Sequence, residues 1–319
     1  MGGGGRMRAV IYHSYGGPEQ LRLAEVPMPV AGRGGVLVRV LACGVNLSDH
    51  EFLTGSPAYA RFAGLFRPRR AILGSDIVGQ VAGIGPGVSG LQIGQRVMAD
   101  AVLQRGGFAE FAALPAALCA LVPEGLSDVL AAALPQPGAI AVQGMAGAAP
   151  GMRVLINGAG GGSGTLALHL AKAAGARVTV VDRGEKLDWL LGLGADEAID
   201  YRLQDFVALG RGWDLILDMV ATRGARRVAA ALAPGGTYRA VGGAVRVILP
   251  LALAGLMPRG RVGVMAVKTG AEVTLDLAAR ALAGRLVPQI HGVWPLDAVP
   301  EALRLVGSGG ALGKIVIRP

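Results

Sequence analysis

The 319-residue sequence predicts an α/β protein in which a doubly wound parallel sheet is inserted into a mostly β domain. Three observations support this fold class. Short apolar runs broken by Gly and Pro turns fill residues 7–122, a pattern typical of an all-β body. From Ser127, helical Ala/Leu stretches alternate with apolar strands, which predicts a parallel sheet. Strand-like segments return at 290–294 and 314–317, so the chain is expected to come back to its first domain.

The first domain is expected to consist of short strands at 7–12, 21–26, 35–43, 77–84, 96–101 and 106–112. After the third strand, residues 44–50 change from apolar to polar, which indicates a helix start. Asn46 and Asp49 are the candidate capping residues there. Beyond Ser127, strands are expected at 153–156, 177–181, 214–218, 237–241 and 261–267, and a short helix near 299–306.

The strongest motif is a strand, a glycine turn and a helix. Residues 154–156 indicate a buried strand, residues 158–164 include five glycines, and an Ala/Leu-rich helix is expected at 165–174. Glycines let the backbone approach a pyrophosphate closely, and the helix N-terminus offers it free N–H groups and a positive dipole end. The motif therefore predicts dinucleotide binding, although Ala159 stands where the six-residue fingerprint begins with glycine.

Composition excludes several function classes. The net charge is +9, but no Lys/Arg run is interleaved with aromatics, so the charge favours an anionic cofactor or substrate over nucleic acid. Cys43 and Cys119 are too few for a metal cluster or disulfide framework, which fits a cytoplasmic protein. Residues 1–6 lack the apolar core of a secretory signal. Residues 247–257 are too short to span a membrane and predict a buried helix or subunit contact.

The glycine turn lies within a longer signature: Gly151-Met-x-x-Leu155, then Ala159-Gly-Gly-Gly-x-Gly164 and Lys172, with His169 where glutamine is usual. Further matching segments are 44–49, 73–76, 106–110, 193–201, 233–236 and 313–317. At this order and spacing, the chain resembles the medium-chain dehydrogenase/reductase superfamily, and most closely its zinc-less quinone oxidoreductase branch, the ζ-crystallin-like enzymes.

This resemblance implies a domain organisation and an assembly. Residues 123–268 would form a Rossmann dinucleotide-binding domain, inserted in a GroES-like catalytic domain made of residues 1–122 and 269–319. Residues 261–267 would be the edge strand of the Rossmann sheet. In relatives the matching edge pairs across a two-fold axis, which buries an otherwise adhesive edge and implies a homodimer.

The resemblance also bears on the metal. Zinc members of the superfamily place a Cys ligand where Asn46 stands, and a Gly-His-Glu triplet where Gly74, Ser75 and Asp76 stand. Zinc needs thiolate, imidazole or carboxylate ligands at fixed spacing. Asn46 and Ser75 are poor replacements and Asp76 alone cannot hold the ion, so no zinc is expected.

The choice between NADH and NADPH stays open at this point. Asp182 ends a predicted strand at about the spacing of the carboxylate that binds the ribose of NAD, and a carboxylate repels a 2′-phosphate. Arg183 and Lys186 follow in the next turn, as either a solvated turn or a phosphate contact. The resemblance implies that NADPH-using relatives have a basic residue at the Lys186 position and a tyrosine matching Tyr201 beside the adenine.

Ligands of open α/β sheets bind outside the carboxyl ends of the strands, which selects the turns of the predicted Rossmann sheet. Glycines in the later turns are equally consistent with ordinary turn chemistry. With Asn46 added from the resemblance, the candidate cofactor-binding residues are Asn46, Gly158, Ala159, Gly160, Gly161, Gly162, Ser163, Gly164, Asp182, Arg183, Lys186, Tyr201, Val220, Val241, Gly242 and Gly243.

Asn46 and Tyr59 are the candidate catalytic residues. Asn46 either caps a helix or, as the resemblance implies, hydrogen-bonds the reacting carbonyl near the nicotinamide. Tyr59 matches an aromatic over the active site of relatives and either donates a proton or packs. The predicted activity is zinc-independent hydride transfer from NADPH or NADH to a quinone or an activated C=C bond. The alternatives are a zinc-free alcohol/ketone oxidoreductase and a non-catalytic NAD(P)H-binding protein.

Overall fold

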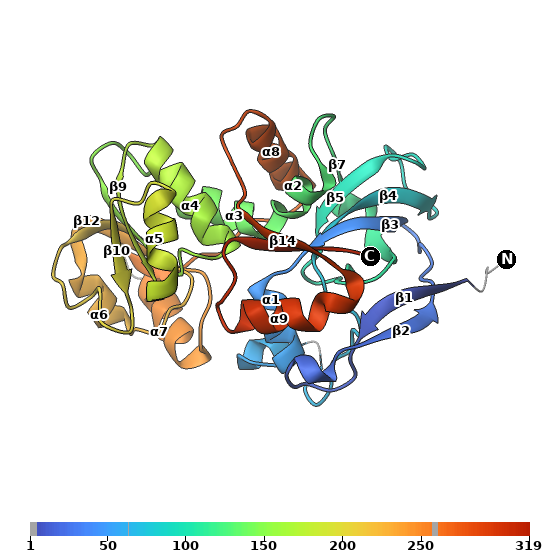
Figure 1. Cartoon of the computed structure of the whole chain (residues 1–319), viewed down its shortest axis with the longest axis horizontal. Coiled ribbons are helices and arrows are strands. Elements are labelled where there is room, and N and C mark those ends of the chain that lie inside the picture. Colours follow the sequence, from blue (N-terminus) through green and yellow to red (C-terminus); the bar gives the residue numbers. More distant parts are fainter. Residues whose placement is uncertain (1–4, 63, 257–260) are drawn as a thin grey trace. The chain divides into compact units, whose positions relative to one another are not determined.

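The computed structural model describes residues 5–62, 64–256 and 261–319, which form two compact units (Figure 1). Unit 1 comprises residues 1–139 and 268–319, and unit 2 comprises residues 140–267. The first division falls later in the chain than the boundary expected at residue 122. The reason is that helix α2, Asp128–Ala132, packs against strands β3 and β4 of unit 1.

Unit 1 is built on a largely antiparallel sheet with the strand order β14-β15-β3-β4-β5-β7, in which β6 also pairs with β3. A separate ribbon joins β1 and β2. The strands are β1 Arg6–Ile11, β2 Arg22–Pro27, β3 Gly35–Gly44, β4 Asp76–Ile84, β5 Arg96–Asp100, β6 Phe111–Pro115, β7 Ala120–Leu121, β14 Ile290–Pro295 and β15 Lys314–Arg318.

Helical segments complete unit 1, and α1 packs against α9. They are α1 Leu47–Thr54, α2, the start of α3 Pro135–Gly144, α8 Ala271–Leu282, α9 Val299–Gly307 and the 3-10 turns η1 Pro18–Gln20, η2 Ala58–Arg61, η3 Ala116–Leu118 and η4 Leu296–Ala298.

Strand β3 shows how the sequence forms this core. Val36, Val38 and Val40 alternate along the strand and are buried, because successive side chains of a strand point to opposite faces. The C-terminal strand β15 pairs antiparallel with the end of β3, in the register Val316 to Gly44. This pairing brings the last residues of the chain beside the start of α1.

One predicted strand of unit 1 was wrong. A strand was expected at 106–112, but β6 begins only at Phe111. Arg105 and Gly106 have φ angles of 57° and 103°, so the chain turns there instead of extending. The N–H groups of Gly107 and Phe108 then donate hydrogen bonds to the carbonyl oxygens of residues 74 and 73, at 3.0 and 2.9 Å. These bonds are not part of a regular strand pairing.

Unit 2 is a six-stranded parallel sheet with the order β10-β9-β8-β11-β12-β13, which confirms the predicted doubly wound sheet (Figure 1). Its strands are β8 Arg153–Asn157, β9 Arg177–Asp182, β10 Glu197–Asp200, β11 Trp213–Asp218, β12 Leu232–Ala240 and β13 Val262–Val264. Its helices are the end of α3, α4 Gly162–Ala173, α5 Gly184–Gly192, α6 Ala225–Ala230 and α7 Val245–Gly255. The short strand β10 was not among the predicted strands.

The strand order of unit 2 reverses between β8 and β11, and ligands of such sheets bind outside the carboxyl ends at this point. Helix α4 begins at Gly162, before the predicted start at 165. A side chain at Gly164 would lie 2.4 Å from the Ala159 carbonyl oxygen, so only glycine permits this close packing. The predicted edge strand is confirmed in β13, although it is shorter than 261–267.

The apolar segment 247–257 forms most of α7, but the expectation of a buried helix is only half right. Val247 and Leu251 are buried, whereas Leu249 and Leu253 are each 58% exposed. Met257 lies outside the described residues, as do residues 1–4 of the N-terminal segment. Among the described residues, no helix is long and apolar enough to cross a membrane.

Candidate active site

The glycine turn after β8 is closely packed against its neighbours. A side chain at Gly158, where φ is 83°, would approach Val220 Cγ2 to 3.2 Å, and one at Gly160 would approach Lys186 Cδ to 2.6 Å. Gly161 precedes α4 in an extended conformation and provides no side-chain cap. The first N–H groups of a helix have no partner within the helix. The turn therefore reaches this close packing only because side chains are missing at these positions.

Asp182 holds this turn in place rather than pointing away from it. Its Oδ2 accepts a hydrogen bond from the Gly160 N–H at 2.7 Å, and its Oδ1 accepts one from the Arg183 N–H at 2.8 Å. The Lys186 ammonium lies 3.8 Å from Oδ1, and both side chains are largely buried. Burial lowers the pKa of Lys186, and the neighbouring Asp182 opposes that shift. The carboxylate thus has both oxygens engaged inside the protein.

Asp218, at the end of β11, organises the neighbouring turn. Its Oδ1 accepts hydrogen bonds from Asn157 Nδ2 and from the N–H groups of Val220 and Ala221, at 2.8 to 2.9 Å. Its Oδ2 accepts one from the Tyr238 hydroxyl at 2.7 Å. Burial and Asp218 raise the pKa of Tyr238 far above its usual range, so the hydroxyl remains a donor. Ala221 is held at a φ of 38° by this arrangement.

The turns predicted from strand ends therefore lie side by side. Val220 adjoins Gly158, and a side chain at Gly243 would lie 2.8 Å from the Ala221 carbonyl oxygen. Val241 and Gly242, in the same turn as Gly243, are partly exposed. The Tyr201 N–H bonds to the Asp182 carbonyl, and its side chain is 45% exposed. The candidate residues of unit 2 thus form one continuous edge.

In unit 1, Asn46 caps α1 and is buried in a polar cluster. Its Nδ2 donates to Asp76 Oδ2 at 2.9 Å and to Ser75 Oγ at 3.2 Å. The Lys314 ammonium donates to Asn46 Oδ1 at 2.5 Å and to Asp76 Oδ2 at 2.9 Å. The side chains of Lys314 and Asp76 are 3% and 0% exposed. We call Asn46, Ser75, Asp76 and Lys314 the ammonium cluster.

Two further buried carboxyl groups adjoin the ammonium cluster. Asp49 accepts hydrogen bonds from the N–H groups of Asn46 and Gly74, yet burial raises its pKa to about 6. Asp100 pairs with Asp76 across β4 and β5, and burial followed by repulsion from Asp76 raises its pKa to about 7. Asp100 Oδ2 has no hydrogen-bond partner among the described residues. Ionisation of either carboxyl group is therefore unfavourable in the folded protein.

Tyr59 lies in η2. Its hydroxyl donates to Glu51 Oε1 at 3.1 Å, and both residues are partly exposed. Burial raises the pKa of Glu51, and the hydrogen bond from Tyr59 opposes this. The structure thus pairs Tyr59 with a carboxylate, an arrangement that the sequence did not indicate.

The donors of the ammonium cluster do not suit a zinc ion. Asn46 Oδ1 and Asp76 Oδ2, the oxygens that a metal would need, both accept hydrogen bonds from the Lys314 ammonium. A second cation beside this buried ammonium would be strongly repelled. Elsewhere in the described ranges, no group of three or more His, Cys, Asp or Glu side chains could hold a metal ion.

Sequence reasoning missed Lys314 as a site residue. One signal for it was present, because Lys314 is one of four lysines and stands in the apolar run Gly-Lys-Ile-Val-Ile. A lysine in a buried strand requires a buried partner. Asn157, Asp218 and Tyr238 form the other unforeseen set, although Asp218 ends the strand that was expected at 214–218.

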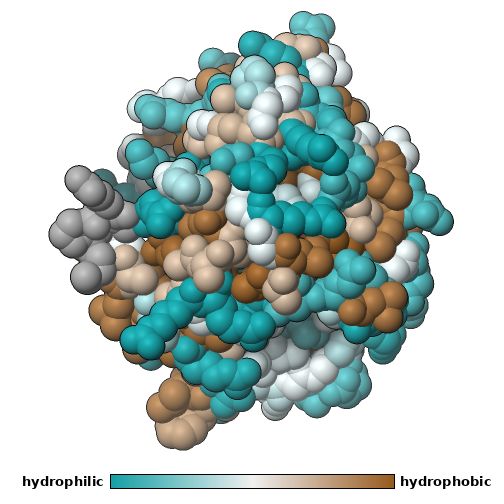
Figure 2. Space-filling model, turned by 90° about the vertical axis from the view of Figure 1, so that its left-hand side faces the viewer, coloured by the Kyte–Doolittle hydropathy of each residue, from teal (hydrophilic) through white to brown (hydrophobic). Residues whose placement is uncertain are grey.

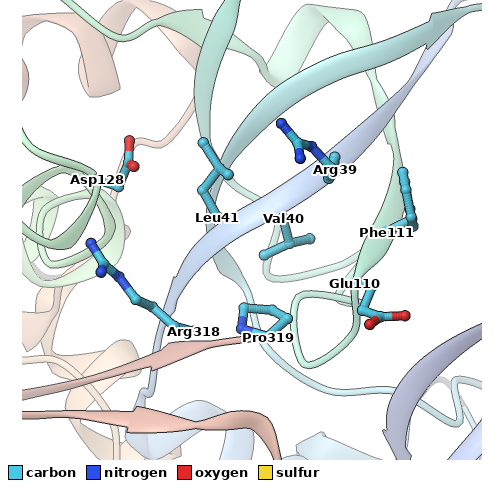
Figure 3. Close-up of a pocket in the computed structure, with 8 residues that line it drawn as sticks. All are labelled: Arg39, Val40, Leu41, Glu110, Phe111, Asp128, Arg318 and Pro319. Carbon is cyan, nitrogen blue, oxygen red and sulfur yellow. The ribbon is translucent and has the colours of Figure 1, made fainter.

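A surface pocket of about 540 Å³ lies against β3, β6 and β15 and includes none of the predicted site residues (Figure 3). Its lining residues are Arg39, Val40, Leu41, Glu110, Phe111, Asp128, Arg318 and Pro319. The two acidic side chains are already paired, Glu110 with Arg8 and Asp128 with Arg96. Because both signs of charge surround the pocket, it has no clear preference for a charged ligand.

The glycine turn follows β8, at the point where the strand order of the parallel sheet reverses. This arrangement, together with the antiparallel unit 1, is typical of a nicotinamide-dependent dehydrogenase or reductase. Two family models match the chain: an alcohol dehydrogenase GroES-like domain over residues 32–124, and a zinc-binding dehydrogenase over residues 193–317. The chain belongs to the medium-chain dehydrogenase/reductase superfamily, in its quinone oxidoreductase branch. It is an NAD(P)H-dependent oxidoreductase.

Individual relatives agree with this assignment. A 2-methylene-furan-3-one reductase of Solanum lycopersicum is 31% identical over 98% of this chain and 79% of its own. A chloroplastic NADPH-dependent alkenal/one oxidoreductase of Arabidopsis thaliana is 28% identical over 98% of this chain and 80% of its own. The quinone oxidoreductase structure from Coxiella burnetii superposes with a TM-score of 0.85, at 26% identity, over 99% of this chain and all of that chain.

The buried carboxyl groups predict an unusual dependence of stability on pH. The pKa values of Asp49 and Asp100 are raised to about 6 and about 7, so their contribution to the free energy of unfolding is fully present below about pH 4. It is lost as the pH rises through 6 to 7. Asp100→Asn should therefore raise the free energy of unfolding by about 1–3 kcal/mol at pH 8 and much less at pH 5.

Urea denaturation at the two pH values measures this difference. Asp188→Asn is the matched control, because Asp188 is exposed and its substitution should have no pH-dependent effect. Equal effects of Asp100→Asn at pH 8 and pH 5 would show that ionisation of Asp100 does not weaken the fold.

Proposed function

We propose that this protein is a zinc-independent, NADPH-dependent reductase of quinones or of C=C bonds conjugated to a carbonyl. The observation that carries the proposal is the ammonium cluster, in which the Lys314 ammonium donates to the side-chain oxygens of Asn46 and Asp76. By the resemblance, these are two of the positions where zinc members of the superfamily have metal ligands. The names of the relatives, a furanone reductase, an alkenal/one oxidoreductase and a quinone oxidoreductase, support the same substrate class. The cofactor supplies the hydride.

Hydride addition to an enone or a quinone leaves negative charge on an oxygen atom. Hydrogen-bond donors placed at that oxygen stabilise the charge as it develops. Asn46 Nδ2 is the proposed donor, because its bond to Ser75 Oγ is the longer of its two bonds, at 3.2 Å, and can be exchanged for a substrate oxygen. The Asp76 bond would then keep the carboxamide in place.

Tyr59 is not the proposed proton donor. Its hydroxyl donates to Glu51, and giving up a proton there would place two negative charges about 3 Å apart. Proton delivery from solvent is therefore the simpler route to the reduced product.

NADPH is proposed over NADH because Asp182 is already engaged. Both of its oxygens accept hydrogen bonds from the backbone of the same region, so ribose hydroxyls would have to compete for them. Lys186 and Arg183 put positive charge at the end of β9, beside Asp182, and this charge would attract a 2′-phosphate. The Arabidopsis thaliana relative is named for its dependence on NADPH.

A homodimer through β13 is also proposed. β13 is an edge strand, and edge strands are commonly covered because their unpaired N–H and C=O groups attract other chains. Helix α7 packs on β13 and exposes Leu249 and Leu253. Figure 2 shows one face of the molecule, on which apolar residues form patches among hydrophilic ones. Covering such apolar residues would stabilise a dimer.

The activity itself is tested by following NADPH absorbance with a panel of quinones and enones. We expect turnover that persists after treatment with EDTA, and product analysis that shows a reduced C=C bond or a hydroquinone. Activity that disappears with EDTA and returns with zinc would contradict the proposal. Reduction of the C=O bond instead would identify an alcohol/ketone oxidoreductase, and tight NADPH binding without any turnover would identify a binding protein.

The cofactor preference is tested with Lys186→Ala. We expect the Kd for NADPH to rise about tenfold, which corresponds to the loss of one charge-assisted contact, while the Kd for NADH changes little. Fluorescence titration with each cofactor measures both constants. Lys172→Ala removes the same charge from a residue that pairs with Asp196 and is the matched control. An unchanged Kd for NADPH would contradict the role given to Lys186.

The dimer is tested by light scattering coupled to gel filtration. We expect about twice the chain mass of 32.3 kDa, and a shift to the monomer mass on Leu253→Asp. A charge at a buried apolar contact is strongly unfavourable. Leu203→Asp is the control, because Leu203 is 82% exposed and lies elsewhere in unit 2. A monomeric wild-type protein would contradict this assembly.

A further inference from the structure

Lys314 reaches the site through the pairing of two strands that are far apart in the sequence. β15 lies antiparallel to β3, and this places Lys314, its first residue, beside the end of β3 and the start of α1. Gly44 makes room for it, since a side chain there would lie 2.6 Å from Lys314 Cε and 2.2 Å from the Ala132 carbonyl oxygen. The missing side chain at Gly44 therefore leaves the space that the long Lys314 side chain occupies.

The surroundings of Asn46 allow only one orientation of its carboxamide. As observed, Oδ1 faces the Lys314 ammonium and Nδ2 faces the Asp76 carboxylate. Turning the carboxamide over would point its N–H groups at the ammonium and its oxygen at the carboxylate. Both contacts would become repulsive, because an ammonium group only donates and an ionised carboxylate only accepts.

We propose that Lys314 is a positioning residue that fixes the orientation of the Asn46 carboxamide, so that its N–H edge is the one presented to a substrate oxygen. The inference deepens the proposed function and rests on it for its catalytic consequence. In this arrangement the ammonium does not touch the substrate. It acts through Asn46 Oδ1, and an Asn46 turned the wrong way would present a carbonyl oxygen to a developing oxyanion.

A substitution of Lys314 alone would leave the Asp76 carboxylate buried and unpaired, which strongly destabilises a protein. Asp76 must therefore be neutralised in the same variant. The test therefore compares two neutral pairs, Lys314→Gln with Asp76→Asn and Lys314→Met with Asp76→Asn. Glutamine retains a donor for Asn46 Oδ1 and methionine does not, although their sizes are similar. Thermal unfolding and the Kd for NADPH establish that both double variants are folded and bind the cofactor.

We expect kcat with an enone to be about tenfold lower in the methionine variant than in the glutamine variant, as for the loss of one hydrogen bond. The Kd for NADPH should be the same in both. With Asn46→Ala added to each, the difference should vanish, because Lys314 acts only through that side chain. Equal kcat values in the two double variants, or a difference that persists without Asn46, would overturn the proposal.

A second readout separates this inference from the proposed activity. The carboxamide resonances of Asn46 can be identified in a ¹⁵N NMR spectrum by their loss in Asn46→Ala. We expect slow hydrogen exchange of this carboxamide in the wild-type protein and in the glutamine variant, and fast exchange in the methionine variant. If the wild-type protein reduces no quinone or enone, the proposed function fails, and equal exchange rates in both variants would still overturn the role of Lys314.

Discussion

The buried ion pair between Lys314 and Asp76 links three elements of unit 1, namely β15, β4 and α1. A desolvated ammonium is tolerated only with an opposite charge and further hydrogen bonds, and breaking such a pair by removing one partner typically destabilises a protein by about 3–5 kcal/mol. The pair joins the first residue of β15 to the first residue of β4. Through Asn46, it also ties both strands to the start of α1. The C-terminal strand is therefore part of the candidate site as well as of the sheet.

Unit 2 uses buried carboxylates in a related way. Asp182 and Asp218 end neighbouring regions of the parallel sheet, and each accepts backbone N–H groups from the turn beside it. Charge-assisted hydrogen bonds of this kind are stronger than neutral ones and fix the backbone. The edge proposed to face a dinucleotide thus consists of glycine backbone held by carboxylates, and the cationic Lys186 is the side chain that covers Gly160.

Local patterns in the sequence were sufficient for the parts of the fold that depend on neighbouring residues. Short stretches of sequence predict the glycine turn at 158–164, the helix start at Asn46 and the alternating burial along β3. The contact of Lys314 with Asn46 could not be predicted in this way, because 268 residues separate them and only the pairing of β15 with β3 brings them together. The same holds for Asp182, whose position in the chain was identified but whose orientation depends on Gly160.

A lysine ammonium and a zinc ion are both cations, but they permit different chemistry. Zinc can bind a carbonyl oxygen directly and polarise it. The ammonium of Lys314 already donates to Asn46 and Asp76 and is buried, so in the proposed site its charge would reach a substrate only through the oriented carboxamide. A hydrogen bond from a carboxamide stabilises an oxyanion less than a metal does. Substrates whose charge is delocalised on hydride addition, as in an enone or a quinone, require less stabilisation, so they would fit the proposed weaker electrophile better than a simple ketone.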